Sequence, residues 1–353
     1  MKRSTLIGTI IGAAAVIGIG VTIAMNSGSS KSDNYSVALV TSTGGVDDKS
    51  FNQSAWAGIK QFGEKNHMKQ GENGFSYLVS NDGSEIKSNL QQAVKAQYKL
   101  VVGISFMGGP AMKQVAKTNP NTQFAMVEAQ VPYKNAASIM FHSEQSSYLA
   151  GVAAAESSKT GKIGFVGGVK GEVIEQFETG FKAGVLATNP KATFVSQYAN
   201  TFTDAAKGKT IAAAMYASGV DVIFQAAGAT GNGVFAEAKA ENQNTTADKK
   251  VWVVGVDMDQ KQDGNYTTKD GKKANFTLAS AIKRVDNAVE RVAKQGKDNQ
   301  FPGGKTVTYG LKEQGVDIAR DSMSESAWQA TQKAKQQILD GKITVPTKLS
   351  AIK

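Results

Sequence analysis

Cysteine is absent from this 353-residue chain, and histidine occurs only at His67 and His142. Without cysteine the protein has no disulfides, thiolate zinc sites, iron–sulfur clusters or cysteine nucleophiles. Two histidines also disfavour a histidine-rich metal centre or a Ser-His-Asp catalytic triad. These absences remove much of enzyme chemistry.

Positive charge is in excess, with 40 Lys and Arg residues against 30 Asp and Glu residues and a formal net charge of +10. Such an excess is typical of proteins that bind nucleic acid or an anionic surface. The two signs are interspersed, however: 14 basic and 10 acidic residues lie between Lys239 and Glu313, with no helix-length stripe of one sign. We therefore predict a mixed, solvated surface and no nucleic-acid partner.

A long hydrophobic run lies at the amino terminus, where Lys2 and Arg3 precede the uncharged residues 6–25, LIGTIIGAAAVIGIGVTIAM. As a helix this run would span about 30 Å, the thickness of the hydrocarbon core of a membrane. Positive charge ahead of it places the amino terminus inside the cell and the rest of the chain outside. A cleaved signal peptide is the alternative, although its apolar region usually has only about 7–15 residues. We predict a membrane anchor or signal segment at 1–25 and a flexible linker at 26–35.

Short apolar, β-branched runs alternate with amphipathic stretches in the rest of the chain. Strands are predicted at 36–41, 75–79, 100–104, 124–127, 162–166, 193–198, 220–225 and 251–256. Helices are predicted at 53–65, 85–97, 111–117, 143–158, 172–186, 204–217 and 234–241, and the residues after Phe276 indicate a strand passing into a long helix. Strand starts lie roughly 25–40 residues apart and the runs are continuously apolar, which is typical of parallel sheets with both faces covered. Together with the length of the chain, this pattern predicts two doubly wound α/β lobes.

Ligands of such sheets bind beyond the carboxyl ends of the strands. The corresponding loops hold many of the glycines and several isolated acidic residues, and they lie at 41–52, 105–110, 127–130, 226–233 and 255–260. A recognition site is therefore expected in these loops.

Two partial motifs do not support other chemistry. Lys207-Gly208-Lys209-Thr210 resembles the end of a phosphate-binding loop, but Thr203 stands where the first glycine is required. The acidic residues near Asp257 suggest a calcium loop, but Lys261 replaces its third acid.

The first strand-end loop carries the most specific motif, because residues 37–62, VALVTSTGGVDDKSFNQSAWAGIKQF, closely resemble the opening of the basic membrane protein family. These are purine-nucleoside-receptor-like substrate-binding lipoproteins of nucleoside ABC importers. The resemblance continues over nearly the whole exported chain, at 148–155, 162–185, 204–239, 251–260 and 301–319. It implies a type I periplasmic-binding-protein fold, in which three crossings join two doubly wound α/β lobes and the ligand lies in the cleft between them. Lobe 1 is expected to contain 36–142 with about 278–320, and lobe 2 to contain 143–277 with about 321–353.

The resemblance also implies a ligand site. Phe51 and Phe177 match the two aromatic plates of the family, between which a nucleobase would stack. Asp48 and Asn52 lie beside Phe51, where they are suited to hydrogen bonds with base edges or ribose. Gly228 would let the backbone approach the ligand.

Three charged residues complete the implied site. Glu128 stands where the family usually has an aspartate that contacts the base, so the acceptor is one methylene longer. Asp257 matches the ribose carboxylate, whose two oxygens can accept both hydroxyls. Lys283 matches the lysine on the ribose side. Met258 stands where an arginine is common in relatives, which removes one polar contact.

The implied function is capture without chemistry, so we predict no catalytic residue, no metal site and no cofactor. The protein would be an extracytoplasmic substrate-binding protein that binds nucleosides, purine nucleosides above all, and delivers them to a membrane ABC permease. Relatives normally carry a lipid-bearing cysteine, which this chain lacks. Residues 6–25 would therefore anchor the protein at the outer face of the cytoplasmic membrane, or the protein is released after cleavage. Two alternatives stay open: a nucleoside hydrolase or phosphorylase using Asp47, Asp48 and Asp257, and a ligand-sensing regulator on the same fold.

Overall fold

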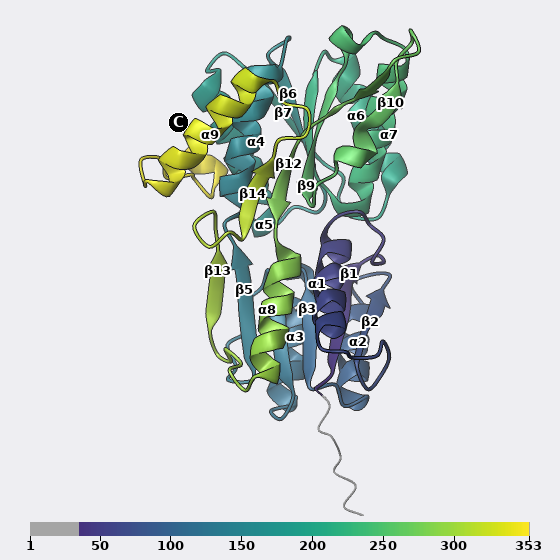
Figure 1. Cartoon of the computed structure of the whole chain (residues 1–353), viewed down its shortest axis with the longest axis vertical. Coiled ribbons are helices and arrows are strands. Elements are labelled where there is room, and N and C mark those ends of the chain that lie inside the picture. Colours follow the sequence, from purple (N-terminus) through teal and green to yellow (C-terminus); the bar gives the residue numbers. More distant parts are fainter. Residues whose placement is uncertain (1–34, 353) are drawn as a thin grey trace, which may run out of the picture. The chain divides into compact units, whose positions relative to one another are not determined.

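Two six-stranded sheets form two lobes over residues 35–352, the part of the chain that the computed structural model describes (Figure 1). The predicted anchor or signal segment at 1–25 and nearly all of the predicted linker lie outside these residues. Within residues 35–352, no helix is both long enough and apolar enough to cross a membrane. The two parallel-sheet lobes confirm the predicted α/β fold class.

Lobe 1 has the strand order β13-β5-β4-β3-β1-β2, and all neighbouring strands are parallel. Its strands are β1 (Val37–Thr43), β2 (Phe75–Ser80), β3 (Leu100–Ile104), β4 (Gln123–Val127), β5 (Ala136–Phe141) and β13 (Thr306–Tyr309). Its helices are α1 (Phe51–Lys65), α2 (Glu85–Lys95), α3 (Gly109–Thr118), α8 (Val285–Lys297) and the short turn η1 (Phe106–Gly108).

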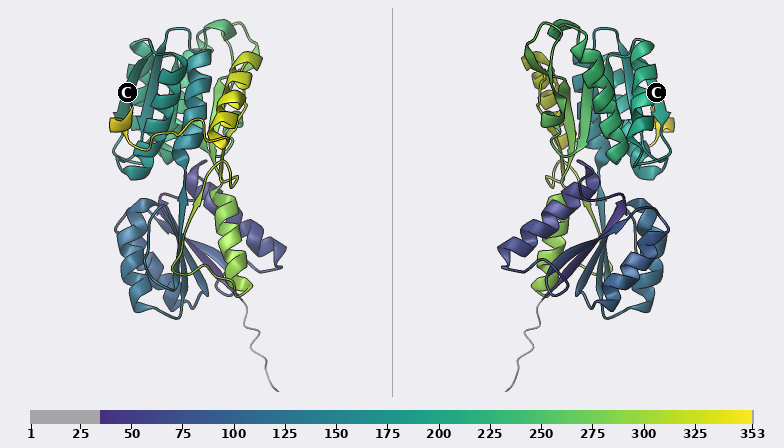
Figure 2. Two further views of the ribbon diagram at one scale, coloured as in Figure 1. Left: turned by 90° about the vertical axis from the view of Figure 1, so that its left-hand side faces the viewer. Right: turned by 90° about the vertical axis from the view of Figure 1, so that its right-hand side faces the viewer.

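The sheet of lobe 1 is covered on both faces, as Figure 2 shows from two sides. Val37 and Leu39 of β1 join the apolar core formed with α1 and α8. Ala38 and Val40, which point the other way, join the core formed with α2 and α3. Because neither face meets solvent, β1 begins with four consecutive apolar residues, Val37 to Val40, and this is why its position could be predicted.

Lobe 2 has the strand order β14-β12-β9-β8-β6-β7, in which only β14 pairs antiparallel to its neighbour. Its strands are β6 (Lys162–Gly167), β7 (Thr193–Tyr198), β8 (Val222–Ala226), β9 (Trp252–Asp257), β12 (Thr277–Lys283) and β14 (Val316–Ala319), with a hairpin of β10 (Asn265–Thr267) and β11 (Lys273–Asn275). Its helices are α4 (Ser143–Ser157), α5 (Glu172–Thr188), α6 (Ala205–Ala217), α7 (Gly231–Gln243) and α9 (Glu325–Leu339). The short turns are η2 (Gly228–Thr230), η3 (Ala247–Lys249), η4 (Lys261–Gly264) and η5 (Leu349–Ala351).

Three segments of chain cross between the lobes, after β5, after β12 and after β13. We expected residues of about 278–320 to belong to lobe 1, but only α8 and β13 do so. β12 and β14 pair with each other in the sheet of lobe 2. The reason is that the chain leaves lobe 2 at the carboxyl end of β12 and returns to it before β14, so the crossing points fall inside the range.

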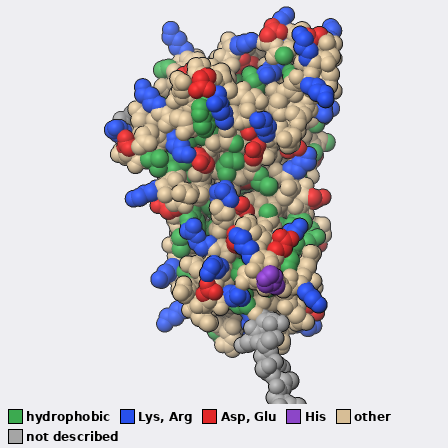
Figure 3. Space-filling model, in the orientation of Figure 1, with side chains coloured by type: hydrophobic (Ala, Val, Ile, Leu, Met, Phe, Trp, Pro, Cys, Tyr) green, Lys and Arg blue, Asp and Glu red, His purple; other side chains and the backbone are tan. Residues whose placement is uncertain are grey.

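Charged side chains of both signs are interspersed over the face of the molecule shown in Figure 3. No large area of that face carries basic residues alone. This arrangement agrees with the mixed surface that the sequence predicts.

Candidate ligand-binding site

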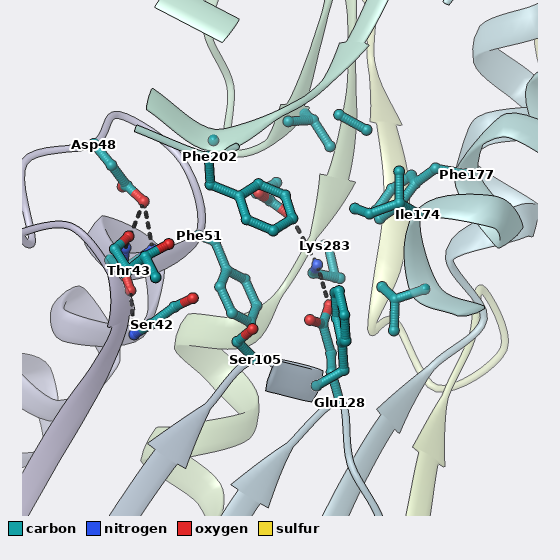
Figure 4. Close-up of a pocket in the computed structure, with 17 residues that line it drawn as sticks. Ser42, Thr43, Asp48, Phe51, Ser105, Glu128, Ile174, Phe177, Phe202 and Lys283 are labelled. Carbon is teal, nitrogen blue, oxygen red and sulfur yellow. Dashed lines mark hydrogen bonds and ion pairs between the residues drawn. The ribbon is translucent and has the colours of Figure 1, made fainter. Parts of the chain in front are cut away.

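A cavity with about 510 Å³ of empty space, including the solvent at its mouth, lies between the lobes, beyond the carboxyl ends of strands from both sheets (Figure 4). All eight residues of the predicted site line it: Asp48, Phe51, Asn52, Glu128, Phe177, Gly228, Asp257 and Lys283. They come from six separate strand-end or helix-start segments, so the fold brings together residues that are more than 230 positions apart in the sequence. Contact of each residue with a ligand remains a prediction.

Asp48 shapes the loop that presents Phe51. Its carboxylate accepts hydrogen bonds from the backbone N–H groups of Ser50, Asn52 and Gln53 at 2.9, 2.9 and 3.0 Å. These N–H groups open α1 and have no partner within the helix, so Asp48 acts as its cap. Burial raises the pKa of Asp48, the three N–H donors oppose this, and the nearby charge of Asp257 adds to it.

Asn52 is held by the same loop. Its Oδ1 accepts from the backbone N–H of Ser42 at 2.9 Å, and its Nδ2 donates to Asp48 Oδ2 at 3.0 Å and to the Thr43 carbonyl at 3.4 Å. The amide group thus has protein partners on both of its atoms. In this arrangement Asp48 and Asn52 fix the position of Phe51, the first residue of α1, at the wall of the cavity.

A buried ion cluster forms the floor of the cavity. Lys283 Nζ lies 2.5 Å from Glu128 Oε1 and 2.9 Å from Asp257 Oδ1, and only 3% of the Lys283 side chain is exposed. Lys283 and Asp257 end the neighbouring strands β12 and β9 of lobe 2, whereas Glu128 follows β4 of lobe 1. The cluster therefore connects the two lobes.

The cluster is electrostatically coupled. Burial would lower the pKa of Lys283, but the carboxylates of Asp257 and Glu128 outweigh this and hold it above its usual value. Burial raises the pKa of Glu128, and the ammonium of Lys283 only partly offsets that. With two carboxylates on one ammonium, and Asp48 close by, the charged groups of the cavity carry an excess of negative charge when ionised.

Three of the ten non-glycine residues with positive φ in the described part of the chain line this cavity. Ser105, Glu128 and Asp257 follow or end strands β3, β4 and β9 with φ angles of +85°, +67° and +65°. Such angles cost a non-glycine residue about 1–3 kcal/mol and persist only where the surroundings impose them. Gly228 after β8, with φ +57°, adopts the same conformation without a Cβ penalty. Strained residues that gather around one cavity are typical of functional sites.

The two predicted aromatic plates differ in exposure. Phe51 is half-buried, and its ring lies 4.4 Å from Lys283 Nζ. Phe177 is only 1% exposed; its ring packs edge-to-face on Phe224 at 6.1 Å and lies 5.1 Å from Lys283 Nζ. Phe177 therefore offers the cavity a small part of its surface, and much of its ring belongs to the core of lobe 2.

Two aromatic residues of the cavity were missed by the sequence analysis. Phe202, in the loop between β7 and α6, and Phe106, in η1, are half-buried and pack edge-to-face at 6.5 Å. Figure 4 shows the rings of Phe202 from lobe 2 and Phe51 from lobe 1 both reaching into the cavity. Phe202 follows the carboxyl end of a correctly predicted strand, so applying the strand-end rule to that strand would have found it.

Among residues 35–352, no group of three or more acidic or histidine side chains is arranged to hold a metal ion. The polar part of the cavity consists instead of the ion cluster, the side chains of Asp48 and Asn52, and the hydroxyls of Ser42, Thr43 and Ser105. Such a lining suits a small organic ligand with hydroxyl and amide-like groups beside an aromatic or apolar face.

Two α/β lobes joined by three crossings around a polar and aromatic cavity define the architecture of a solute-binding protein. The family model of PnrA-like ABC transporter substrate-binding proteins, the Bmp family, matches residues 35–348. The chain belongs to this family, which confirms the resemblance found in the sequence.

Relatives support this assignment. The chain is 48% identical over 323 residues to the ABC transporter nucleoside-binding protein BmpA of Lactococcus lactis, covering 91% of this chain and 92% of that protein. It is 49% identical over 320 residues to the CD4+ T-cell-stimulating antigen of Listeria monocytogenes, covering 90% and 89%. It is 34% identical over 329 residues to basic membrane protein D of Borreliella burgdorferi, covering 90% and 89%.

Solved structures show the same fold. The crystal structure of an ABC transporter solute-binding protein from Aeropyrum pernix matches with a TM-score of 0.75 and 25% identity, covering 88% of this chain and 93% of that one. The crystal structure of a transcriptional activator of the comK gene from Bacillus halodurans matches with a TM-score of 0.69 and 17% identity, covering 87% and 99%. The second likeness concerns the fold alone.

Proposed function

We propose that this substrate-binding protein is a nucleoside receptor that captures nucleosides, purine nucleosides above all, and delivers them to an ABC permease. The observation that carries the proposal is the cavity, in which Phe51 and Phe202 from opposite lobes lie beside the buried cluster of Glu128, Asp257 and Lys283. The similarity to a protein named as nucleoside-binding gives independent support.

Each part of a nucleoside has a suitable partner in the cavity. A nucleobase has two π-faces, and stacking on an aromatic side chain contributes about 1–3 kcal/mol per base. The cis hydroxyls of ribose are donors, and each oxygen of Asp257 has a second lone pair to accept one beside its contact with Ser50 or Lys283. Lys283 supplies a donor on the same side, and the hydroxyls of Ser42, Thr43 and Ser105 line the lobe 1 wall.

The charge of the cavity favours nucleosides over nucleotides. Three buried carboxylates, those of Asp48, Glu128 and Asp257, line the cavity together with one ammonium, that of Lys283. A phosphate would bring further negative charge into this poorly solvated space, where repulsion between like charges is strong. A neutral nucleoside avoids this repulsion.

Location and partners follow from the same proposal. A receptor of this family would work outside the cytoplasmic membrane, held there by residues 6–25 or released after their cleavage, and would dock on permease subunits once the lobes have closed. The absence of cysteine rules out a thioether-linked lipid.

Neither alternative function is favoured by the site. A nucleoside-cleaving enzyme needs a carboxylate free to act on water or ribose, yet Asp48 caps α1 and Asp257 is paired with Lys283 and with the hydroxyl of Ser50. A regulator is suggested only by the fold of the comK activator structure, and a shared fold does not define a function.

Isothermal titration calorimetry of the full chain tests the proposal. Inosine, guanosine and adenosine are expected to bind with micromolar or lower dissociation constants, equivalent to about 8 kcal/mol or more. Hypoxanthine and ribose, which each lack half of the contacts, should bind at least a hundredfold more weakly, and inosine monophosphate at least tenfold more weakly. Binding of sugars or free bases in preference to nucleosides would contradict the proposal, and so would release of free base from inosine, detected by chromatography.

A further inference from the structure

The loop between β1 and α1, residues 44–50, belongs to lobe 1 but makes several contacts with lobe 2. Ser50 Oγ donates a hydrogen bond to Asp257 Oδ2 at 2.5 Å. Gln260 Nε2 donates to the backbone carbonyl of Lys49 at 3.0 Å. Lys49 Nζ also forms an ion pair with Asp263 Oδ1 at 2.6 Å. The loop therefore bridges the two lobes beside the cavity.

Ser50 determines how Asp257 presents its carboxylate. Ser50 is completely buried, and its hydroxyl holds one oxygen of Asp257 while Lys283 faces the other oxygen at 2.9 Å. Lys283 belongs to the same lobe as Asp257, whereas Ser50 comes from the opposite lobe. When the lobes separate, Asp257 keeps Lys283 and loses Ser50. The orientation of this carboxylate therefore depends on lobe closure.

Gln260 is the fixed point on lobe 2 to which the loop attaches. Its Oε1 accepts hydrogen bonds from Gln225 Nε2 and from the backbone N–H of Val256, both at 2.9 Å. Its own N–H donates to Ser280 Oγ at 3.1 Å. These bonds within lobe 2 leave Nε2 directed at the Lys49 carbonyl of lobe 1. Because Gln260 is 4% exposed, little water is available to replace that bond.

We propose that Ser50 and Gln260 are positioning residues that couple closure of the lobes to the ligand site, Gln260 by holding the β1–α1 loop on lobe 2 and Ser50 by orienting Asp257. The proposal deepens the proposed function, because it rests on Asp257 being a ligand-binding carboxylate. The ligand enters while the lobes are apart, and the two contacts form as they close. They therefore slow ligand release and have little effect on ligand entry.

Surface plasmon resonance with the immobilised full chain and inosine tests the kinetic part. Ser50→Ala is expected to raise the dissociation rate constant at least tenfold while the association rate constant stays within threefold, and Gln260→Met should act in the same direction. Lys49→Met is the matched control: it removes an ion pair on the same loop, but the Lys49 side chain is 55% exposed, so both rates should stay within twofold. Urea unfolding of each variant checks that the fold is retained.

Distance measurement between the lobes tests the coupling without relying on ligand kinetics. Because the chain has no cysteine, Ser88→Cys on α2 and Lys207→Cys on α6, both exposed and one in each lobe, can carry spin labels without removal of other thiols. Double electron–electron resonance measures the distance between the two labels in buffer and with 1 mM inosine. The population at short distance, which corresponds to closed lobes, should be smaller for Ser50→Ala than for the labelled parent protein. Lys49→Met should show no such loss.

The outcomes separate the two proposals. If the parent protein binds no nucleoside in calorimetry, the proposed function fails. The coupling is then still tested by comparing the distance distributions of the parent and of Ser50→Ala in buffer. Equal short-distance populations in the parent and in Ser50→Ala would overturn the coupling. So would a parent without any short-distance population in either condition, or a Ser50→Ala dissociation rate within twofold of the parent.

Discussion

Lys283 has an unusual position for a lysine, because its ammonium lies among two carboxylates and two aromatic rings. Glu128 and Asp257 provide the negative charge, and Phe51 and Phe177 lie 4.4 and 5.1 Å from Nζ. A buried ammonium is stable only when its charge is compensated in this way. The same groups that stabilise the lysine also line the cavity, so a substitution among them changes both the ion cluster and the cavity.

The carboxylate of Asp257 gives the first prediction. Asp257→Asn removes the negative charge and one acceptor oxygen, so inosine affinity should fall at least tenfold in calorimetry. Asp263→Asn, which removes a carboxylate of the same lobe outside the cavity, serves as the control and should stay within twofold. An unchanged dissociation constant for Asp257→Asn would contradict the assigned role of this residue.

The two phenylalanines of lobe 2 give a prediction that separates binding from folding. Phe202→Ala should weaken inosine binding by about 1–3 kcal/mol and change the free energy of unfolding little, because its ring is half-buried at the cavity. Phe177→Ala should instead lower the free energy of unfolding by about 3–5 kcal/mol, because its ring is 1% exposed and packs on Phe224. Calorimetry and urea unfolding measure the two effects. The reverse pattern would favour Phe177 over Phe202 as the second plate.

Asp321 gives a prediction on pH. Burial, together with the nearby carboxylate of Asp259, raises the pKa of Asp321 from 3.8 to about 7, against the opposing hydrogen bond from Ser280. Between these pH values the folded protein keeps a proton that the unfolded chain loses, so this group makes the free energy of unfolding fall as pH rises from about 4 to 7. Asp321→Asn removes this contribution, and above pH 7 it should raise stability by about 1–2 kcal/mol, less than the full shift implies because the side chain is partly exposed.

Urea unfolding at pH 5 and pH 8 checks this prediction. The stability difference between Asp321→Asn and the parent should grow in favour of the variant towards pH 8. A difference that is the same at both pH values would show that Asp321 titrates near its usual value.

Some residues of the site could be predicted from the sequence and others could not, depending on whether the residue lies in a local sequence motif. Phe51 and Asp257 lie in local motifs that resemble a known family, so they could be named from sequence. Ser50 and Gln260 could not, because their significance lies in contacts with residues 207 and 211 positions away that only the folded chain brings close. Phe202 carries a local signal as well, because it follows the carboxyl end of strand β7.

At the scale of elements, strands covered on both faces were the easiest to predict. The range predicted for β3, 100–104, agrees with the structure, because a run of buried apolar residues between polar turns has few other interpretations. β13 and β14, of four residues each, were missed because such short strands at a sheet edge carry too few residues for a pattern. Helix α9 was missed because its buried face consists largely of Ala and Thr.

The contact between α4 and α5 gives a prediction at this scale. A Cβ built on Gly180 would lie 2.2 Å from the Glu144 carbonyl oxygen, and one on Gly184 would lie 2.1 Å from that of Tyr148. Glycine therefore sets how closely the two helices approach. Gly180→Ala should lower the free energy of unfolding by about 1–3 kcal/mol.

Gly83→Ala is the control for this prediction, because its added Cβ would meet only the flexible end of Met107 at 3.7 Å. It should change stability by less than about 0.5 kcal/mol. Chemical denaturation measures both variants. A Gly180→Ala protein as stable as the parent would show that the helices can move apart without loss.

At the scale of the whole molecule, surface charge and cavity charge have opposite signs. The full chain has a formal net charge of +10, whereas the charged groups of the cavity are three carboxylates and one ammonium. The sequence could predict the first from composition alone. The charge of the cavity depends on which carboxylates the fold brings together. In the proposed function, this charge separates a nucleoside receptor from a binder of phosphorylated ligands.

The order of the strands could be predicted only in part. The βαβ spacing of the sequence indicates parallel sheets and two lobes. It does not show where the chain crosses between them, and the assignment of β12 and β14 to lobe 1 was wrong for this reason. The positions of the crossings depend on contacts between elements that are far apart in the chain. Those contacts follow from the fold of the family.

A crystal structure of the full chain grown with inosine tests the central claim most directly. The account predicts that the base lies in the cavity between Phe51 and Phe202, with the ribose hydroxyls within hydrogen-bond distance of Asp257 and with Ser50 still bound to that carboxylate. Inosine bound elsewhere on the molecule, or bound in the cavity with its ribose away from Asp257, would contradict it.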